Sequence, residues 1–91
     1  MRAVYKDVVL AESDRTELVE NNHYFPRESV NMDLFVKSDT EYTCPWKGEA
    51  TYYSIKIGDE IIKDAAWSYE DPKEKARNIK GHLAFEKQFV E

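Results

Sequence analysis

The chain has 91 residues, of which 42% are hydrophobic and 34% charged, and its formal net charge at pH 7 is -5. This composition predicts one small globular domain spanning residues 1–91 and argues against intrinsic disorder. Nucleic-acid binding usually needs a basic stripe on the protein surface, and this acidic chain shows none, so we exclude nucleic acid as a partner.

The single cysteine and the hydropathy pattern indicate the cellular compartment of the protein. Cys44 has no partner for an intramolecular disulfide, which fits a reducing compartment. The N-terminus meets charge at Arg2 and lacks the apolar stretch of a secretory signal. No apolar run approaches the roughly 20 residues of a membrane span. We therefore expect a cytoplasmic protein with no membrane partner, and its small core leaves a homo-oligomer open.

The first third of the chain predicts short strands separated by polar turns. Apolar stretches predict strands at residues 2–5, 8–11 and 17–20. Lys6-Asp7 suits a tight turn, and residues 21–23 predict another, because asparagine tolerates left-handed backbone angles. Residues 27–35 are compatible with a helical turn but do not decide the matter.

The best-defined element is a hairpin over residues 50–67, whose turn is Gly58-Asp59. A glycine at the first turn position fits a type II′ turn, which matches the twist of paired strands. A loop of two residues places Ile55 opposite Ile62. The hairpin therefore has a predicted register.

That register also divides the side chains of the hairpin between two faces. Beyond the turn it places Tyr52 opposite Ala65. Because side chains alternate along a strand, Tyr53 and Ile55 lie on the predicted core face. Tyr52 and Trp67 share the other, more polar face.

The C-terminal third predicts a short helix and a last strand. Asp71-Pro72-Lys73-Glu74 is typical of a helix start, because aspartate caps a helix and proline suits its first turn. Ala76 and Ile79 would then face the core, and Gly81 would end the helix. Residues 82–85 predict a strand. The fold class is therefore mainly β, with one short helix near the C-terminus.

The segment Cys44-Pro45-Trp46-Lys47-Gly48 is the strongest candidate for chemistry. Proline and glycine bracket a bend from which the three other side chains can project. A neighbouring ammonium group favours the thiolate, so Cys44 is a candidate nucleophile with Lys47 as its catalytic support. The alternative is that Cys44 is a small buried hydrophobic residue at a strand end.

Aromatic residues gather around this segment and the hairpin. In small β domains such residues most often form the core or cross-strand pairs. With a lysine beside them, they could instead line a cleft for a planar or anionic ligand. The predicted ligand-binding residues are Trp46, Lys47, Tyr52, Trp67 and Tyr69.

Two histidines complete the set of candidate catalytic residues. His23 and His82 are candidate general bases, because histidine changes its charge near neutral pH. Together with Cys44 they have no spacing diagnostic of a metal site, and structural zinc commonly takes four ligands. We therefore predict neither a metal nor another cofactor.

Several segments resemble the domain of unknown function 427 family. They lie at residues 24–30, 43–50, 66–69 and 81–85. The resemblance covers nearly the whole chain and implies a small bacterial or fungal protein with a β-tent fold, in which two antiparallel sheets meet at an angle. Relatives with this fold hold zinc through paired Cys-x-x-Cys knuckles, which this chain lacks. The family has also carried a nucleotidyltransferase label, whereas this sequence has no Gly-Ser loop followed by paired aspartates.

Three functions remain open at this point. The first is a module that binds a small ligand or peptide in the aromatic cleft, with Lys47 meeting an anionic group. The second is an enzyme with Cys44 as nucleophile and His23 or His82 as base. The third is a structural or oligomerisation domain in which the exposed aromatic residues form the interface.

Overall fold

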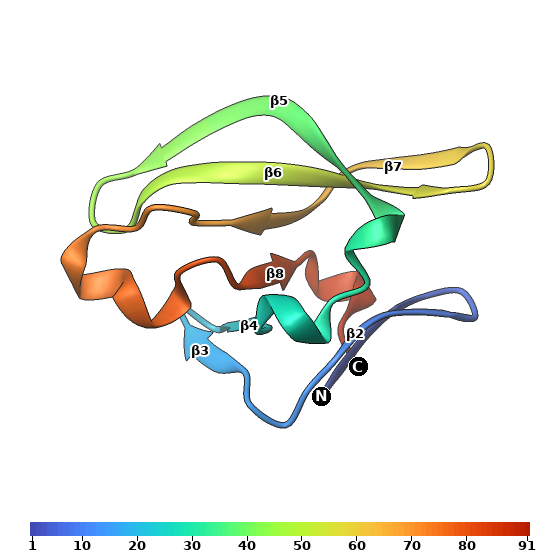
Figure 1. Ribbon diagram of the computed structural model, residues 1–91, viewed down its shortest axis with the longest axis horizontal. Coiled ribbons are helices and arrows are strands. Elements are labelled where there is room, and N and C mark those ends of the chain that lie inside the picture. Colours follow the sequence, from blue (N-terminus) through green and yellow to red (C-terminus); the bar gives the residue numbers. More distant parts are fainter.

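A computed structural model describes residues 1–91 and contains short strands and short 3₁₀ helices (Figure 1). The strands are β1 (Arg2–Tyr5), β2 (Val8–Glu12), β3 (Glu17–Val19), β4 (Asn22–Tyr24), β5 (Phe35–Cys44), β6 (Gly48–Ile57), β7 (Glu60–Ser68) and β8 (Leu83–Phe85). The helices are η1 (Arg27–Ser29), η2 (Met32–Leu34), η3 (Glu74–Ile79) and η4 (Lys87–Phe89). The predicted mainly β fold with little helix is confirmed.

The strands form three antiparallel sheets, where the family resemblance implied two. These are the hairpins β1-β2 and β3-β4 and a four-stranded sheet in the order β5-β6-β7-β8. Phe25, just after β4, exchanges two backbone hydrogen bonds with Leu83 of β8, at 2.7 and 2.9 Å. In Figure 1, β8, β4 and β3 consequently lie below β5, β6 and β7. The hairpin β3-β4 therefore lies next to β8, at the edge of the four-stranded sheet.

The ends of the chain lie side by side (Figure 1). The amide of Glu91 donates to the carbonyl of Arg2 at 2.9 Å, and the Arg2 guanidinium also bonds the Glu91 carboxylate. No helix is long and apolar enough to cross a membrane.

The central hairpin begins in the predicted register and then departs from it. Ile55 pairs with Ile62 as expected, and only Gly58 has a positive φ in the turn, as in type II′. Further along, Tyr52 pairs with Trp67 rather than with Ala65, so the prediction is wrong there by two residues. The two aromatic side chains are thus direct cross-strand neighbours.

A bulge in β7 causes this shift. Asp64 has a φ of 54°, and its amide donates to the Ser54 hydroxyl at 3.1 Å. Thr40, from a matching irregularity in β5, donates its hydroxyl to the Asp64 carboxylate at 2.6 Å. The Ser54 hydroxyl therefore satisfies the backbone amide that the bulge removes from the ladder. Such a contact between strands distant in sequence cannot be anticipated from a local pattern.

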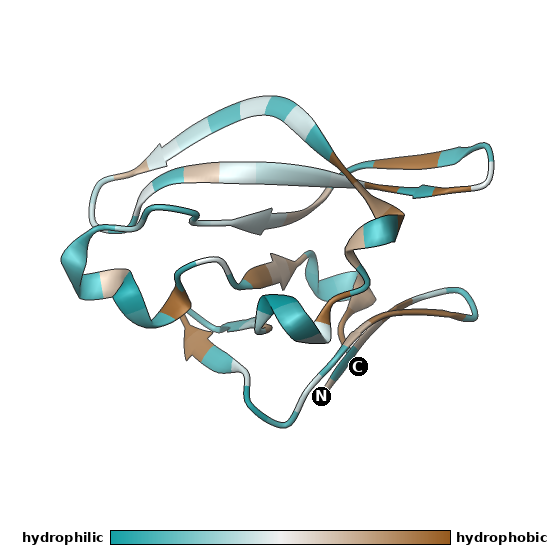
Figure 2. Ribbon diagram, in the orientation of Figure 1, coloured by the Kyte–Doolittle hydropathy of each residue, from teal (hydrophilic) through white to brown (hydrophobic).

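Strand β5 is a long strand that the sequence did not predict. Most of its side chains are exposed or half-buried, and only Phe35 and Cys44, at its two ends, are buried. It lies at the outer edge of the large sheet, where Figure 2 shows a mainly hydrophilic stretch. An edge strand without apolar alternation gives little strand signal.

The predicted C-terminal helix is a 3₁₀ helix that begins at Glu74, with Lys73 as its N-cap and no side-chain cap bond. Asp71 therefore does not cap it, contrary to prediction. Ala76 and Ile79 are buried as expected. The strand predicted after it is confirmed as β8.

Two buried clusters use opposite faces of the sheet. The main core includes Leu83 and Phe85, whereas Ala84 between them belongs to the second cluster. This division follows the alternation of side chains along a strand. The second cluster consists of Tyr24, Cys44, Ala50, Tyr69, Ala76, Ile79 and Ala84, with Val19, Tyr52 and Trp67 packed against it.

Candidate functional site

The Cys-Pro-Trp-Lys-Gly segment is the turn that joins β5 to β6. Cys44 pairs with Gly48 across the base of the turn. Gly48 has a φ of 107°, a backbone conformation that L side chains rarely adopt. Lys73 fixes the loop, because its amide bonds the Lys47 carbonyl at 2.9 Å and its ammonium bonds the Pro45 carbonyl at 2.7 Å. The side chains of this turn are therefore held in defined positions.

Lys47 is buried, with only 7% of its side chain exposed. Its ammonium forms an ion pair with Glu20 and lies 5.4 Å from the ring centroid of Trp46 and 5.2 Å from that of Tyr69. Both rings offer their negative faces to the cation. We call Glu20, Trp46, Lys47 and Tyr69 the aromatic corner.

Glu20 reaches Lys47 because of the turn between β3 and β4. Glu20 and Asn21 both have a positive φ, as the two central residues of a type I′ turn do. The prediction placed this turn at residues 21–23. In the structure, His23 instead belongs to β4.

The charges of this ion pair are mutually stabilised. Burial by itself would lower the pKa of Lys47, but the hydrogen bond with Glu20 and the nearby tyrosines outweigh it and raise that pKa overall. Hydrogen bonds from Lys47 and Trp46 lower the pKa of Glu20. The lysine thus stays charged and is already balanced inside the protein.

Trp46 is the most exposed of the predicted ligand-binding residues, at 38%. Its indole nitrogen donates to the Glu20 carboxylate at 3.1 Å. The ring is therefore fixed in orientation while part of its surface stays in contact with water.

The other predicted aromatic residues belong to the second cluster or pack against it, next to the corner. Tyr52 and Trp67 have ring centroids 6.4 Å apart, and the Trp67 indole donates to the Tyr24 hydroxyl at 3.1 Å. Tyr69 is 2% exposed, and burial raises its pKa to about 12. Sequence reasoning did not select Tyr24, although it lies in a segment that resembles the family.

Cys44 lies in the second cluster and is only 5% exposed. The two histidines make their hydrogen bonds elsewhere, His23 with the Thr16 hydroxyl at 2.9 Å and His82 with the Lys80 carbonyl at 3.1 Å. No group of three or more histidine, cysteine, aspartate or glutamate side chains is arranged to hold a metal ion. The zinc of β-tent relatives therefore does not fit this chain.

Sequence reasoning missed a polar network on the opposite face of the sheet. The Glu70 carboxylate accepts hydrogen bonds from Arg27 at 2.5 Å, from the Ser68 hydroxyl at 2.5 Å and from the Tyr53 hydroxyl at 3.3 Å. Arg27 also donates its Nε to the Gly81 carbonyl at 3.0 Å. The only sequence signal was that Arg27, Ser68 and Gly81 lie in segments that resemble the family.

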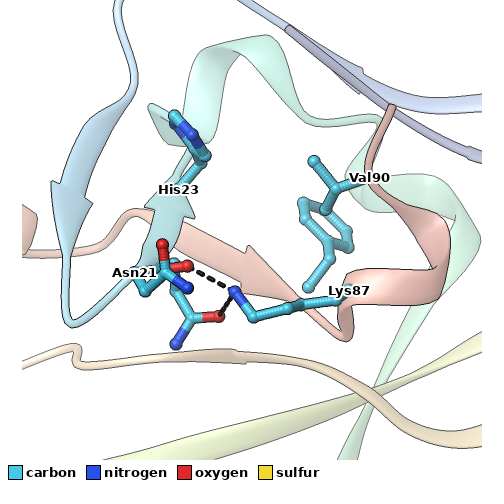
Figure 3. Close-up of a pocket in the computed structure, with 6 residues that line it drawn as sticks. Asn21, His23, Lys87 and Val90 are labelled. Atoms are coloured by element: carbon cyan, nitrogen blue, oxygen red, sulfur yellow. Dashed lines mark hydrogen bonds between the residues drawn. The ribbon is translucent and has the colours of Figure 1, made fainter.

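Three cavities open on the surface, and none is lined by Cys44 or by the five predicted ligand-binding residues. Two of them, of about 390 and 380 Å³, share Glu70. The third, of about 290 Å³, is lined by Asn21, Asn22, His23, Phe85, Lys87 and Val90. The Lys87 ammonium donates to the Asn21 carbonyl and to the side-chain oxygen of Asn22, so this cation is already engaged. Figure 3 draws these hydrogen bonds as dashed lines from Lys87.

The match to a family model extends over residues 1–91, and the model is described as Domain of unknown function (DUF427). The chain therefore belongs to the DUF427 family. No curated protein matches the chain.

Proposed function

We propose that the domain is a binding module for a small planar ligand, which stacks on Trp46 and donates a hydrogen bond to Glu20. The observation that carries this proposal is the fixed, partly exposed indole of Trp46. An ion pair, an indole hydrogen bond and two cation–π contacts all converge on this corner. A rigid exposed aromatic ring can bind a planar group with little loss of conformational entropy.

The charge of the corner determines the ligand chemistry that we propose. Because Glu20 balances Lys47, the corner has no free positive charge for an anion. The Glu20 side chain is 50% exposed, and each carboxylate oxygen can accept a further hydrogen bond. Planar ligands that carry N–H donors therefore suit this corner better than carboxylates. Tyr52 and Trp67, whose rings pack against each other beside the corner, remain candidate ligand-binding residues in this proposal.

The test compares two planar molecules of equal shape and opposite charge. Benzamidine offers N–H donors to Glu20, and benzoate offers none. In a Trp67→Phe variant, which leaves Trp46 as the only tryptophan, benzamidine should quench the fluorescence and benzoate should not. Equal quenching by both molecules, or by neither, would overturn the proposal.

Matched variants locate the binding. Glu20→Gln should weaken benzamidine binding, whereas Glu41→Gln, at an exposed residue of β5, should leave it unchanged. Circular dichroism verifies that both variants fold. If light scattering instead gives the mass of a dimer, and Trp46→Ala returns it to that of a monomer, the corner is an oligomer interface.

We also propose that the large sheet and the hairpin β3-β4 together correspond to the β-tent arrangement of the family resemblance. The curvature between β7 and β4 supports it (Figure 1). We also propose a cytoplasmic location, which the lone cysteine supports. A bacterial source is proposed from the family resemblance.

A further inference from the structure

The largest cavity lies away from the aromatic corner and contains only polar residues. Its volume is about 390 Å³, and it is lined by Arg27, Glu28, Glu70, Lys80, Gly81 and His82. Arg27 and Glu28 come from η1, whereas residues 80–82 connect η3 to β8. Because no hydrophobic residue lines the cavity, it offers a ligand charge and hydrogen bonds together with the carbon stems of its charged side chains.

One of the two carboxylates in the cavity, that of Glu70, is already hydrogen-bonded by the protein itself, and its side chain is 40% exposed. Glu70 accepts hydrogen bonds from Arg27, Ser68 and Tyr53, and Ser68 is completely buried. The negative charge of Glu70 and the positive charge of Arg27 therefore compensate each other, so that Lys80 supplies the unpaired positive charge of the cavity and Arg27 supplies hydrogen-bond donors.

The positive groups, in contrast, retain unused donors. The Arg27 guanidinium has five N–H donors, of which Nε and Nη2 contact Gly81 and Glu70 while Nη1 has no partner. It also lies over the Tyr53 ring, 5.9 Å from the centroid, which fixes its orientation. The Lys80 ammonium makes neither a hydrogen bond nor an ion pair.

The His82 ring is oriented by the carbonyl of Lys80, which accepts a hydrogen bond from Nδ1. Its other nitrogen, Nε2, is free to contact a ligand. Glu28 is exposed and unpaired, so it is the one group that opposes an anion in this cavity.

We propose that this cavity binds the oxyanion of a small, strongly polar molecule, a carboxylate or a phosphate ester, between Arg27 and Lys80. Arg27 Nη1 donates to the anion from a fixed position, and Lys80 closes over it from the rim. Planar guanidinium donors match the geometry of carboxylate and phosphate oxygens.

The experiment is an NMR titration of the backbone amides with inorganic phosphate and, separately, with acetate. Potassium chloride keeps the ionic strength constant. The amides of Gly81 and His82 should shift in a saturable manner with at least one of the two anions, and chloride alone should not shift them. The anion that binds more tightly tells whether the natural group is a phosphate or a carboxylate.

Two variants at exposed residues should move the affinity in opposite directions. Lys80→Gln removes an attraction and should weaken binding by about two- to fivefold, the size of one exposed charge interaction. Glu28→Gln removes a repulsion and should tighten binding by a similar factor. Neither side chain bonds to another part of the protein, so both variants should fold normally.

The proposal is overturned if neither anion produces saturable shifts beyond those of chloride. It is also overturned if both variants bind as the parent protein does. A third variant, Arg27→Lys, keeps the charge but loses the guanidinium fork, and it should bind the anion more weakly than the parent.

Discussion

Two cations, on opposite sides of the same sheet, each pair with a carboxylate and lie near an aromatic ring, but they differ in their exposure to solvent. Lys47 is paired with Glu20 and packed against the rings of Trp46 and Tyr69, and its side chain is 7% exposed. Arg27 is paired with Glu70 and lies over a single ring, and its side chain is 37% exposed. One cation is enclosed, and the other borders a cavity.

The difference shows that an arrangement of cation, carboxylate and ring does not by itself define a binding site. At Lys47 the ammonium is enclosed by Glu20 and two aromatic rings, and the indole beside it is the part of the corner that a ligand can reach. At Arg27 the carboxylate of Glu70 also accepts hydrogen bonds from two hydroxyl groups, Ser68 and Tyr53, and Nη1 of the guanidinium has no hydrogen-bond partner. Exposure to solvent and a bordering cavity therefore separate the two regions.

The largest expected effect comes from removing the enclosed cation. Lys47→Ala should lower the free energy of unfolding by about 3 kcal/mol, because it leaves a void among aromatic rings and takes the partner from Glu20. Lys47→Met fills the same space without charge and should cost about 1 kcal/mol. Urea denaturation measures both. Equal losses would mean that the charge, and not the packing, matters at this corner.

The next effect concerns Tyr69, which packs beneath that cation. Burial raises its pKa to about 12 from an ordinary value of 10. The folded state therefore favours the neutral phenol, and the resulting stability is fully present below pH 10 and is lost as the pH rises to about 12. The loss should be about 2 to 3 kcal/mol. Urea denaturation at several alkaline pH values measures it.

Tyr69→Phe is the control for the alkaline effect. It removes the ionisable group and keeps the ring, so the fall in stability over the same pH range should become shallower. An unchanged pH dependence in this variant would assign the alkaline loss to other groups, of which the Lys47 ammonium, with its raised pKa, is the nearest.

The smallest effect on stability is expected at the open cation. Arg27→Ala should lower the free energy of unfolding by about 1 to 2 kcal/mol, because solvent already screens the pair with Glu70. Urea denaturation again measures the change, alongside Lys47→Ala under the same conditions. A loss larger than that of Lys47→Ala would reverse the comparison and make Arg27 the structural cation.

Much of the local structure could be predicted from neighbouring residues. The first hairpin, the glycine turn at residue 58 and the burial of Ala76 and Ile79 all agree with the structure. These features depend on turn chemistry and on short-range alternation, which a sequence displays directly. The helix cap at Asp71 failed because the segment from Asp71 to Lys73 packs against the turn at Gly48 instead.

The aromatic corner was predicted in part. The segment at residues 44–48 was found, and Tyr52 and Trp67, beside the corner, were placed on one face of the hairpin but not as direct cross-strand partners. Glu20 and Tyr24 were missed, because they lie in a separate hairpin, distant in the sequence, which the backbone hydrogen bonds between Phe25 and Leu83 bring beside the large sheet. The role expected for Lys47 depended on its charge being free, and a distant glutamate decides that question.

The sequence by itself determined a small, acidic, mainly β chain of the DUF427 family with a fixed loop at its only cysteine. Tertiary structure alone decided which charges remain available. Lys47 forms an ion pair with a glutamate 27 positions away in the sequence. Arg27, beside a cavity, pairs with a glutamate 43 positions away. Such pairings arise when a curved sheet brings separate turns together, and no local pattern encodes that curvature.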